Sequence, residues 1–106
     1  MVGPHSSAPL FAALGDPHRL RIVGRLSHRG PQSLARLTEG SGISRQAISK
    51  HVRVLERAGI VRGTRRGRER LLELEPPRLR DARRFLAEVS VEWDRRLDRL
   101  RRLVEE

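Results

Sequence analysis

The chain has 106 residues, enough for one domain with a modest core, and its 23 basic and 13 acidic side chains give a formal net charge of +10 at pH 7. It contains no cysteine, which excludes disulfide scaffolds, thiolate metal sites and cysteine nucleophiles. No apolar run approaches the roughly 18 residues of a membrane span and no signal-peptide pattern is present, so we expect a cytoplasmic protein without a membrane partner.

The first third of the chain predicts a leader and two helices. Residues 1–7 contain Gly, Pro, His and Ser and are expected to form a flexible leader. A short helix is predicted over 10–14. Asp16 and Pro17 are typical of a helix start, with an acidic N-cap and a proline in the first turn, and the second helix ends at Gly30. Its predicted apolar stripe consists of Leu20, Ile22, Val23 and Leu26.

Two further helices are predicted before residue 60, separated by a glycine-containing turn. Ser33 can cap the third helix, which buries Leu34 and Leu37. Ser44 can cap the fourth, and Gly59 follows its end. The predicted inward face of the fourth helix consists of Ala47, Ile48, Val52 and Leu55.

The apolar period then changes from helical to strand-like. Residues 60–61 and 71–74 predict two short strands joined by a hairpin tip at 65–68, where Gly67 can adopt a positive φ. Pro76-Pro77 starts a last helix whose apolar positions recur every three or four residues, close to a heptad seam. These positions are Leu79, Ala82, Leu86, Val89, Trp93, Leu97, Leu100 and Val104. The predicted order is α-α-α-α-β-β-α, mainly α with a small β-hairpin.

The basic excess is almost entirely arginine, since Lys50 is the only lysine. Arginine keeps its charge and binds phosphate or guanine through two parallel hydrogen bonds, so nucleic acid is a candidate partner. The alternative is a chain whose arginines are simply solvated. The aromatic residues (Phe11, Phe85 and Trp93) are too few for a single-strand binder, which stacks bases on aromatic side chains.

The helix predicted from Ser44 is the main candidate for a functional surface. Its outward face consists of Arg45, Gln46, Ser49, Lys50 and Arg53. Arginine and lysine donate to guanine, glutamine pairs with adenine and serine contacts phosphate, so this face suits the major groove of DNA. An ordinary solvated face is the alternative, but most surface helices mix signs, and no carboxylate occurs from Ser44 through Leu55.

Several motifs resemble the ArsR/SmtB family of winged helix-turn-helix repressors. They are Gly30-Pro31, Leu34, Leu37, Gly42-Ile43-Ser44, Ala47-Ile48-Ser49-Lys50-His51-Val52, Leu55 and Ala58-Gly59-Ile60-Val61. The stretch from Asp16 to Ile22 resembles the "DPxRLxIL" second helix of that family, and Arg66-Gly67-Arg68 falls at its wing turn. The resemblance covers roughly residues 9–76.

The resemblance implies a bacterial transcriptional regulator in which residues 8–76 form the winged helix-turn-helix DNA-binding domain. Residues 77–106 would be a C-terminal dimerisation helix of the same domain. By matching position, Arg45, Gln46, Ser49 and Lys50 would contact bases or phosphates. Ser44 would cap the helix and touch phosphate, whereas His51 would pack or contact a backbone phosphate.

Metal sensing, which occurs in this family, is not expected. The Cys-x-Cys pair of metal-sensing members corresponds to Ser33 and Ala35, and no histidine follows His51. The four histidines lack close ligand spacing. We therefore expect no metal and no other cofactor.

The hairpin is a second candidate contact surface. It carries Arg62, Arg65, Arg66, Arg68 and Arg70 against a single Glu69. Arginines inserted into a narrow minor groove gain from its negative potential, so we expect DNA contacts from Arg65, Arg66 and Arg68. The alternative is a charged hairpin that only keeps an edge strand from pairing.

The last helix has an apolar stripe too long for one small core, so a second copy of the chain is expected to cover it. Its many arginines are mixed with acidic residues, which suits a partner helix better than DNA. The predicted dimer interface consists of Phe11, Leu14, Leu86, Val89, Trp93, Leu97 and Leu100.

The favoured hypothesis is a homodimeric repressor that binds an inverted repeat in double-stranded DNA sequence-specifically. One alternative is a regulator that responds to a small molecule held at the dimer interface by Phe11, Phe85 and Trp93. Another is an architectural protein that coats DNA without sequence preference. An enzyme is not expected, because no carboxylate pair, Ser-His-Asp spacing or phosphate-binding glycine loop is recognisable.

Overall fold

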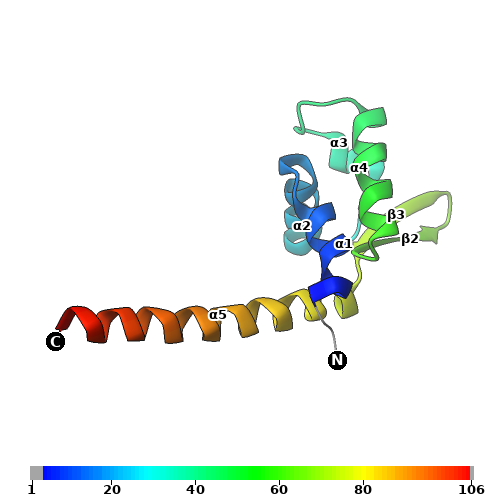
Figure 1. Ribbon diagram of the computed structural model, residues 1–106. Coiled ribbons are helices and arrows are strands. Elements are labelled where there is room, and N and C mark those ends of the chain that lie inside the picture. Colours follow the sequence, from blue (N-terminus) through cyan, green and yellow to red (C-terminus); the bar gives the residue numbers. More distant parts are fainter. Residues whose placement is uncertain (1–3, 106) are drawn as a thin grey trace.

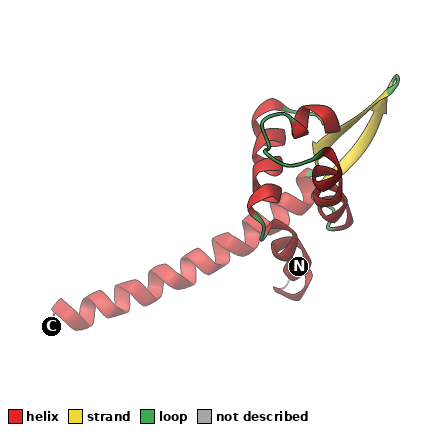
Figure 2. Cartoon of the chain, turned by 90° about the horizontal axis from the view of Figure 1, so that it is seen from above, coloured by secondary structure: helices red, strands yellow, loops and turns green. Residues whose placement is uncertain are grey.

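The computed structural model describes residues 4–105, with side chains from residue 7 onward (Figure 1). The elements in chain order are α1 (Pro4–Leu14), α2 (Pro17–Arg29), β1 (Gln32–Ser33), α3 (Leu34–Thr38), α4 (Arg45–Arg57), β2 (Val61–Arg66), β3 (Glu69–Leu74) and α5 (Pro76–Glu105). The first four helices gather beside a small sheet, and α5 projects away from them as a long arm (Figures 1 and 2). None of the helices in the described part of the chain is long and apolar enough to cross a membrane.

Three helix starts are set by side-chain caps at the residues that the sequence predicts. The carboxylate of Asp16 accepts hydrogen bonds from the amides of His18 at 2.8 Å and Arg19 at 3.1 Å. The hydroxyls of Ser33 and Ser44 each accept from the amide three residues on, at 3.2 Å and 3.1 Å. Each cap satisfies an amide that has no partner inside its helix, which is why the helices begin there.

The N-terminal part differs from the sequence prediction. Helix α1 begins at Pro4, so the predicted flexible leader is wrong over residues 4–7, and residues 1–3 lie outside the described part. The reason is packing: Ser7 and Leu10 are 2% and 0% exposed, and α1 contacts α2 and α5. A helix that starts before these residues allows both to be buried.

The sheet has one strand more than the sequence predicts. Gln32 and Ser33 pair antiparallel with Leu72 and Leu71, so the order is β1-β3-β2. Two residues are too short to show an alternating pattern, and their partner is distant in sequence. The hairpin strands also extend further toward the tip than predicted, because the ladder continues to the pair Arg66 and Glu69.

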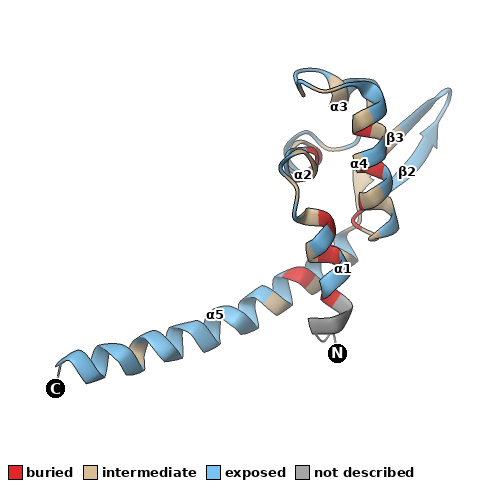
Figure 3. Cartoon of the chain, turned by 45° about the horizontal axis from the view of Figure 1, so that its top comes forward, coloured by how far each residue is buried: buried red, intermediate tan, exposed pale blue. Residues whose placement is uncertain are grey.

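The core lies between the first four helices and the base of the sheet (Figure 3). Its buried apolar side chains are Leu10, Ala13, Ile22, Leu26, Leu37, Ile48, Val52, Leu55, Ile60, Val61, Leu72 and Ala82. Leu20, which the sequence places in the stripe of α2, is instead 54% exposed. It lies two positions before Ile22, about 200° around the helix, so the two side chains cannot share a face.

Helix α5 is buried only near its start. Ala82 reaches the core, Leu79 packs partly against it, and Phe85 contacts Phe11 of α1. From Leu86 onward the large apolar side chains are exposed by 46% to 86%. The exposed set is Leu86, Val89, Val91, Trp93, Leu97, Leu100, Leu103 and Val104. A stripe of this length leaves an apolar surface that the described protomer does not cover (Figure 3).

Candidate nucleic-acid interface

Helices α3 and α4 are joined by a turn that orients α4 across the domain. Gly40 and Gly42 have φ values of 71° and 76°, a left-handed backbone region that glycine enters without steric penalty. Between them, the Ser41 hydroxyl donates to the carbonyl of Ile43 and accepts from its amide. Helix α4 then begins at the Ser44 cap.

The two faces of α4 match the sequence prediction closely. Ile48, Val52 and Leu55 are 1%, 3% and 0% exposed, and Ala47 is half-buried beside them. On the other face Arg45, Gln46, Lys50 and Arg53 are exposed, while Ser49 is half-buried. The outward residues named from sequence therefore share one side of the helix.

The electrostatics of α4 follow from where its carboxylate lies. Glu56 accepts from the Arg70 guanidinium of β3 at 2.6 Å, so its charge is compensated by the hairpin. The side chain of Arg70 crosses β2 at Gly63, where an added Cβ would collide with the guanidinium. The exposed face of α4 from Arg45 to Arg53 thus carries positive charge with no carboxylate beside it in the sequence.

The arginines of the hairpin divide into two groups. At the base, Arg62 Nε lies 2.9 Å from Glu73 and 2.8 Å from Glu75, and the Thr64 hydroxyl also donates to Glu73. The hydrogen bond from Arg62, followed by that from Thr64, holds the pKa of the Glu73 carboxyl below its ordinary value. Arg62 is therefore bound to carboxylates, as is Arg70 through Glu56.

The second group lies at the tip, where Gly67 has a φ of 62° and allows the tight turn. Arg65, Arg66 and Arg68 are exposed, and within residues 4–105 none of them forms an ion pair. The hairpin extends away from the helices, so these charges project from the body of the domain (Figure 1).

A groove of about 360 Å³ separates α4 from the hairpin and brings residues of both elements together. Arg45, Ser49 and Arg53 line it from α4, and Arg68 lines it from the tip. Gln46 and Lys50 lie on the exposed part of α4 outside the groove, as do Arg65 and Arg66 on the hairpin. Sequence reasoning missed the Glu56–Arg70 pair, since only the hairpin register reveals it.

His51 faces α2 and not the exposed face of α4. Its Nδ1 lies 3.3 Å from Nη1 of Arg19 and 3.9 Å from the carboxylate of Asp16, and its ring centroid is 5.5 Å from that of His18. The structure favours the packing role over a phosphate contact. Across residues 4–105, no group of three or more His, Cys, Asp or Glu side chains could hold a metal ion.

The aromatic residues do not form one pocket in the protomer. Phe11 and Phe85 pack against each other with ring centroids 5.6 Å apart, and Leu14 is half-buried nearby in α1. Trp93 is 58% exposed and lies with Phe85 and Val89 along a separate hollow of about 310 Å³ on α5. An effector site that uses all three aromatic residues stays a prediction.

Comparison with known proteins identifies relatives over most of this region. A family model described as a helix-turn-helix domain matches residues 14–64. YuzN of Bacillus subtilis, an uncharacterized HTH-type transcriptional regulator, is 44% identical over 69 residues, covering 59% of this chain and 75% of YuzN. The HTH-type transcriptional regulator Rv2034 of Mycobacterium tuberculosis is 38% identical over 66 residues, and the matched part spans 61% of its length and 62% of this chain.

Solved structures share most of the architecture. The crystal structure of RHA00566, an ArsR family transcriptional regulator, superposes with a TM-score of 0.75 at 31% identity, covering 88% of this chain and 95% of that one. The homodimeric winged helix-turn-helix DNA-binding domain of Mb0332 from Mycobacterium bovis has a TM-score of 0.64 at 21% identity, covering 89% and 91%. At that identity the second likeness concerns the fold alone.

Proposed function

Because this chain belongs to the ArsR family of winged helix-turn-helix, DNA-binding transcriptional regulators, we propose that it is a homodimeric repressor of an inverted-repeat operator. The single observation that carries the proposal is the exposed, carboxylate-free face of α4 beside the unpaired arginines of the hairpin tip. Such a protein acts where the chromosome is, in the cytoplasm.

On this proposal α4 enters the major groove. Arg45 and Lys50 donate to guanine, and Gln46 pairs with adenine through its amide. Ser44 and Ser49 contact phosphate, and Arg53 contacts the backbone on the side of the groove that faces the hairpin. The support is geometric: Arg45, Gln46 and Lys50 are exposed on the first two turns of α4.

The hairpin serves as the wing. Within residues 4–105, Arg65, Arg66 and Arg68 form no ion pair, and they project from the domain, so they can reach flanking phosphates or a narrow minor groove without breaking one. Arg62 and Arg70 are already bound to carboxylates: Arg62 holds the base of the wing, and Arg70 ties β3 to Glu56 of α4. The wing thus has two kinds of arginine: those at the tip that can contact DNA and those in ion pairs that stabilise the fold.

Dimerisation uses the exposed stripe of α5. Leu86, Val89, Trp93, Leu97 and Leu100 are unburied in one protomer, and a second copy related by a two-fold axis would cover the same stripe on both. Phe11 and Leu14 of α1, which are half-buried in one protomer, would join this interface. The two-fold axis would place the two α4 helices in successive major grooves, about 34 Å apart.

Selection of bound sequences from random double-stranded DNA tests the proposal. The expected result is an enriched inverted repeat with half-site centres about one helical turn apart. Gln46→Ala and Lys50→Ala should each change the preferred bases, with a penalty of about 1–3 kcal/mol at the affected base pair. Arg102→Ala, on the last turn of α5, serves as a control and should select the same repeat.

Two results would refute the proposal. Equal affinity for selected and random DNA at matched salt would identify an architectural protein. Unchanged base preferences in both α4 variants would remove α4 from the groove.

A further inference from the structure

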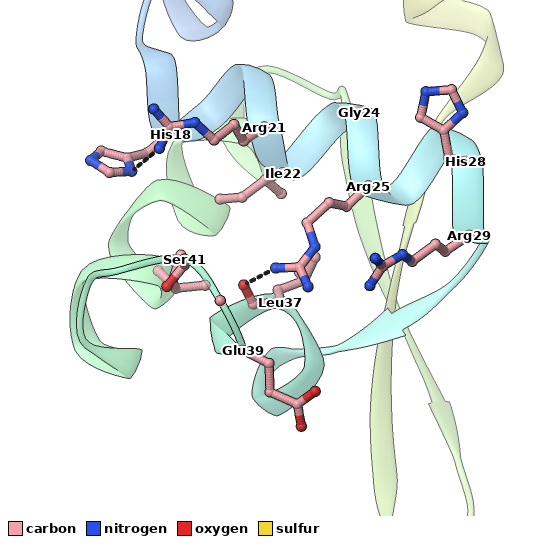
Figure 4. Close-up of a pocket in the computed structure, with 12 residues that line it drawn as sticks. His18, Arg21, Ile22, Gly24, Arg25, His28, Arg29, Leu37, Glu39 and Ser41 are labelled. Carbon is pink, nitrogen blue, oxygen red and sulfur yellow. Dashed lines mark hydrogen bonds between the residues drawn. The ribbon is translucent and has the colours of Figure 1, made fainter.

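A cavity next to α2 is separate from the groove between α4 and the hairpin, and the two share no lining residue. The cavity measures about 570 Å³ and separates α2 from α3 and the α3–α4 turn (Figure 4). The groove is lined by Ser49 of α4, whereas this cavity is lined by the adjacent Ile48. None of the residues assigned above to DNA contact or to the dimer lines it.

The floor of the cavity is apolar. Ile22 of α2, Leu37 of α3 and Ile48 of α4 belong to the core and reach the cavity from three helices. Gly24 adds no side chain, and a Cβ built there meets nothing within 4 Å. The volume falls within the range of about 300–1,000 Å³ that is typical of small-molecule sites.

The rim is cationic. Arg21, Arg25 and Arg29 lie on one ridge of α2 at intervals of four residues, a spacing at which like charges destabilise a helix. Among residues 4–105 none of these arginines forms an ion pair. Glu39 is the acidic residue that lines the cavity, and Figure 4 shows its carboxylate turned away from Arg25 and Arg29.

One guanidinium of the rim is held at the apolar floor. Arg25 Nη1 donates to the carbonyl of Leu37 at 2.9 Å, which holds its side chain across the cavity and leaves other N–H donors unused. Arg21 Nη1 lies 3.4 Å from Nδ1 of His18 at the other end of the ridge. Figure 4 shows Arg29 pointing back toward the same space.

From this arrangement we propose that the cavity binds a small organic anion, a carboxylate with an apolar body. The carboxylate accepts the paired N–H groups of a guanidinium, and the apolar body covers Ile22, Leu37 and Ile48. A bare phosphate or a DNA backbone would accept hydrogen bonds from the arginines of the rim but would leave the apolar side chains of the floor exposed to water. The ligand would also touch Gly40 and Ser41, the turn that precedes α4. The proposal does not depend on the repressor role.

Titration calorimetry of the full chain without DNA tests the proposal, with 2-naphthoate as the probe and neutral 2-naphthamide as its isostere. We expect one naphthoate bound per chain. Its affinity should exceed that of the amide about tenfold or more, the value of one hydrogen bond to a charged group. Arg25→Gln, which removes the guanidinium held across the cavity, should remove that difference.

Gly24→Leu provides the blocking variant. Leucine favours a helix interior more than glycine does, so the variant should fold while its side chain fills the open space at this position. Ser27→Leu adds the same side chain on an exposed part of α2 that does not line the cavity. Naphthoate binding should vanish in Gly24→Leu and persist in Ser27→Leu.

Three results would overturn the proposal. Undetectable naphthoate binding is one, and equal binding of the naphthamide is another. Binding that survives Gly24→Leu would place the ligand elsewhere, such as the exposed stripe of α5. If binding is absent and Arg21→Gln and Arg29→Gln flatten the salt dependence of DNA binding, the ridge contacts phosphate.

Discussion

Neutralising arginines at the wing tip tests quantitatively whether these side chains contact DNA phosphates. Each protomer has Arg66 and Arg68 at the tip, so the variant Arg66→Gln/Arg68→Gln removes four positive charges from a dimer. Each phosphate contact contributes about 0.9 to the slope of log affinity against log salt concentration, so the slope should fall by about 3.6. Between about 50 and 200 mM salt, the wild type should therefore lose ~150-fold more affinity than the variant.

The assay is fluorescence anisotropy of a labelled operator at several salt concentrations. Arg101→Gln/Arg102→Gln removes the same charge from the end of α5 and should leave the slope close to that of the wild type. A slope that does not change in the wing variant would show that the tip does not contact phosphate. Equal changes in both variants would indicate that only net charge matters.

Three further predictions concern stability and assembly. Asp16→Asn should remove a stabilisation that depends on pH. Hydrogen bonding from the Arg19 amide, then from the His18 amide, lowers the pKa of Asp16 in the folded state. The contribution of Asp16 to the free energy of unfolding is therefore present above its ordinary pKa of 3.8 and is lost as pH falls through the folded pKa. The difference in unfolding free energy between wild type and Asp16→Asn should thus shrink between pH 7 and pH 3 in urea titrations, and a constant difference would contradict this. Leu55→Ala should destabilise the fold by about 2–5 kcal/mol in the same assay, because Leu55 is 0% exposed, whereas Leu20→Ala, at 54% exposure, should stay within about 1 kcal/mol. Trp93→Asp/Leu97→Asp should give monomers in analytical ultracentrifugation, and circular dichroism should show that the N-terminal domain stays helical. Arg99→Asp should keep the dimer. A dimeric Trp93→Asp/Leu97→Asp protein would show that the stripe of α5 is not the interface.

Local signals made the helices and the α4 face predictable from sequence. Asp16, Ser33 and Ser44 each supply a side-chain oxygen that accepts a hydrogen bond from a free backbone amide at a helix start. The donor amide lies two or three residues further on, so a short stretch of sequence is enough to predict the cap. The face of Arg45, Gln46 and Lys50 follows from helical periodicity alone.

Non-local contacts were not predictable in this way. The pairing of Gln32 with Leu72 and the ion pair of Glu56 with Arg70 depend on a register that only the folded sheet defines. The helical start of α1 depends on burial of Ser7 against other helices, which the composition of the segment does not show. The four-residue spacing of Arg21, Arg25 and Arg29 carries no prediction by itself, because only the cavity beside α2 shows what these side chains surround.

The missing side chain at Gly63 has a consequence for how this regulator could lose activity through mutation. A larger residue there would not disturb the core, because the atoms it meets are the far end of a flexible arginine. It would instead displace Arg70 and leave Glu56 with an uncompensated negative charge at the end of α4, the helix that we propose enters the major groove. On the proposed function, such a substitution would weaken operator binding without unfolding the protein, and suppressor mutations would be expected at Glu56 itself.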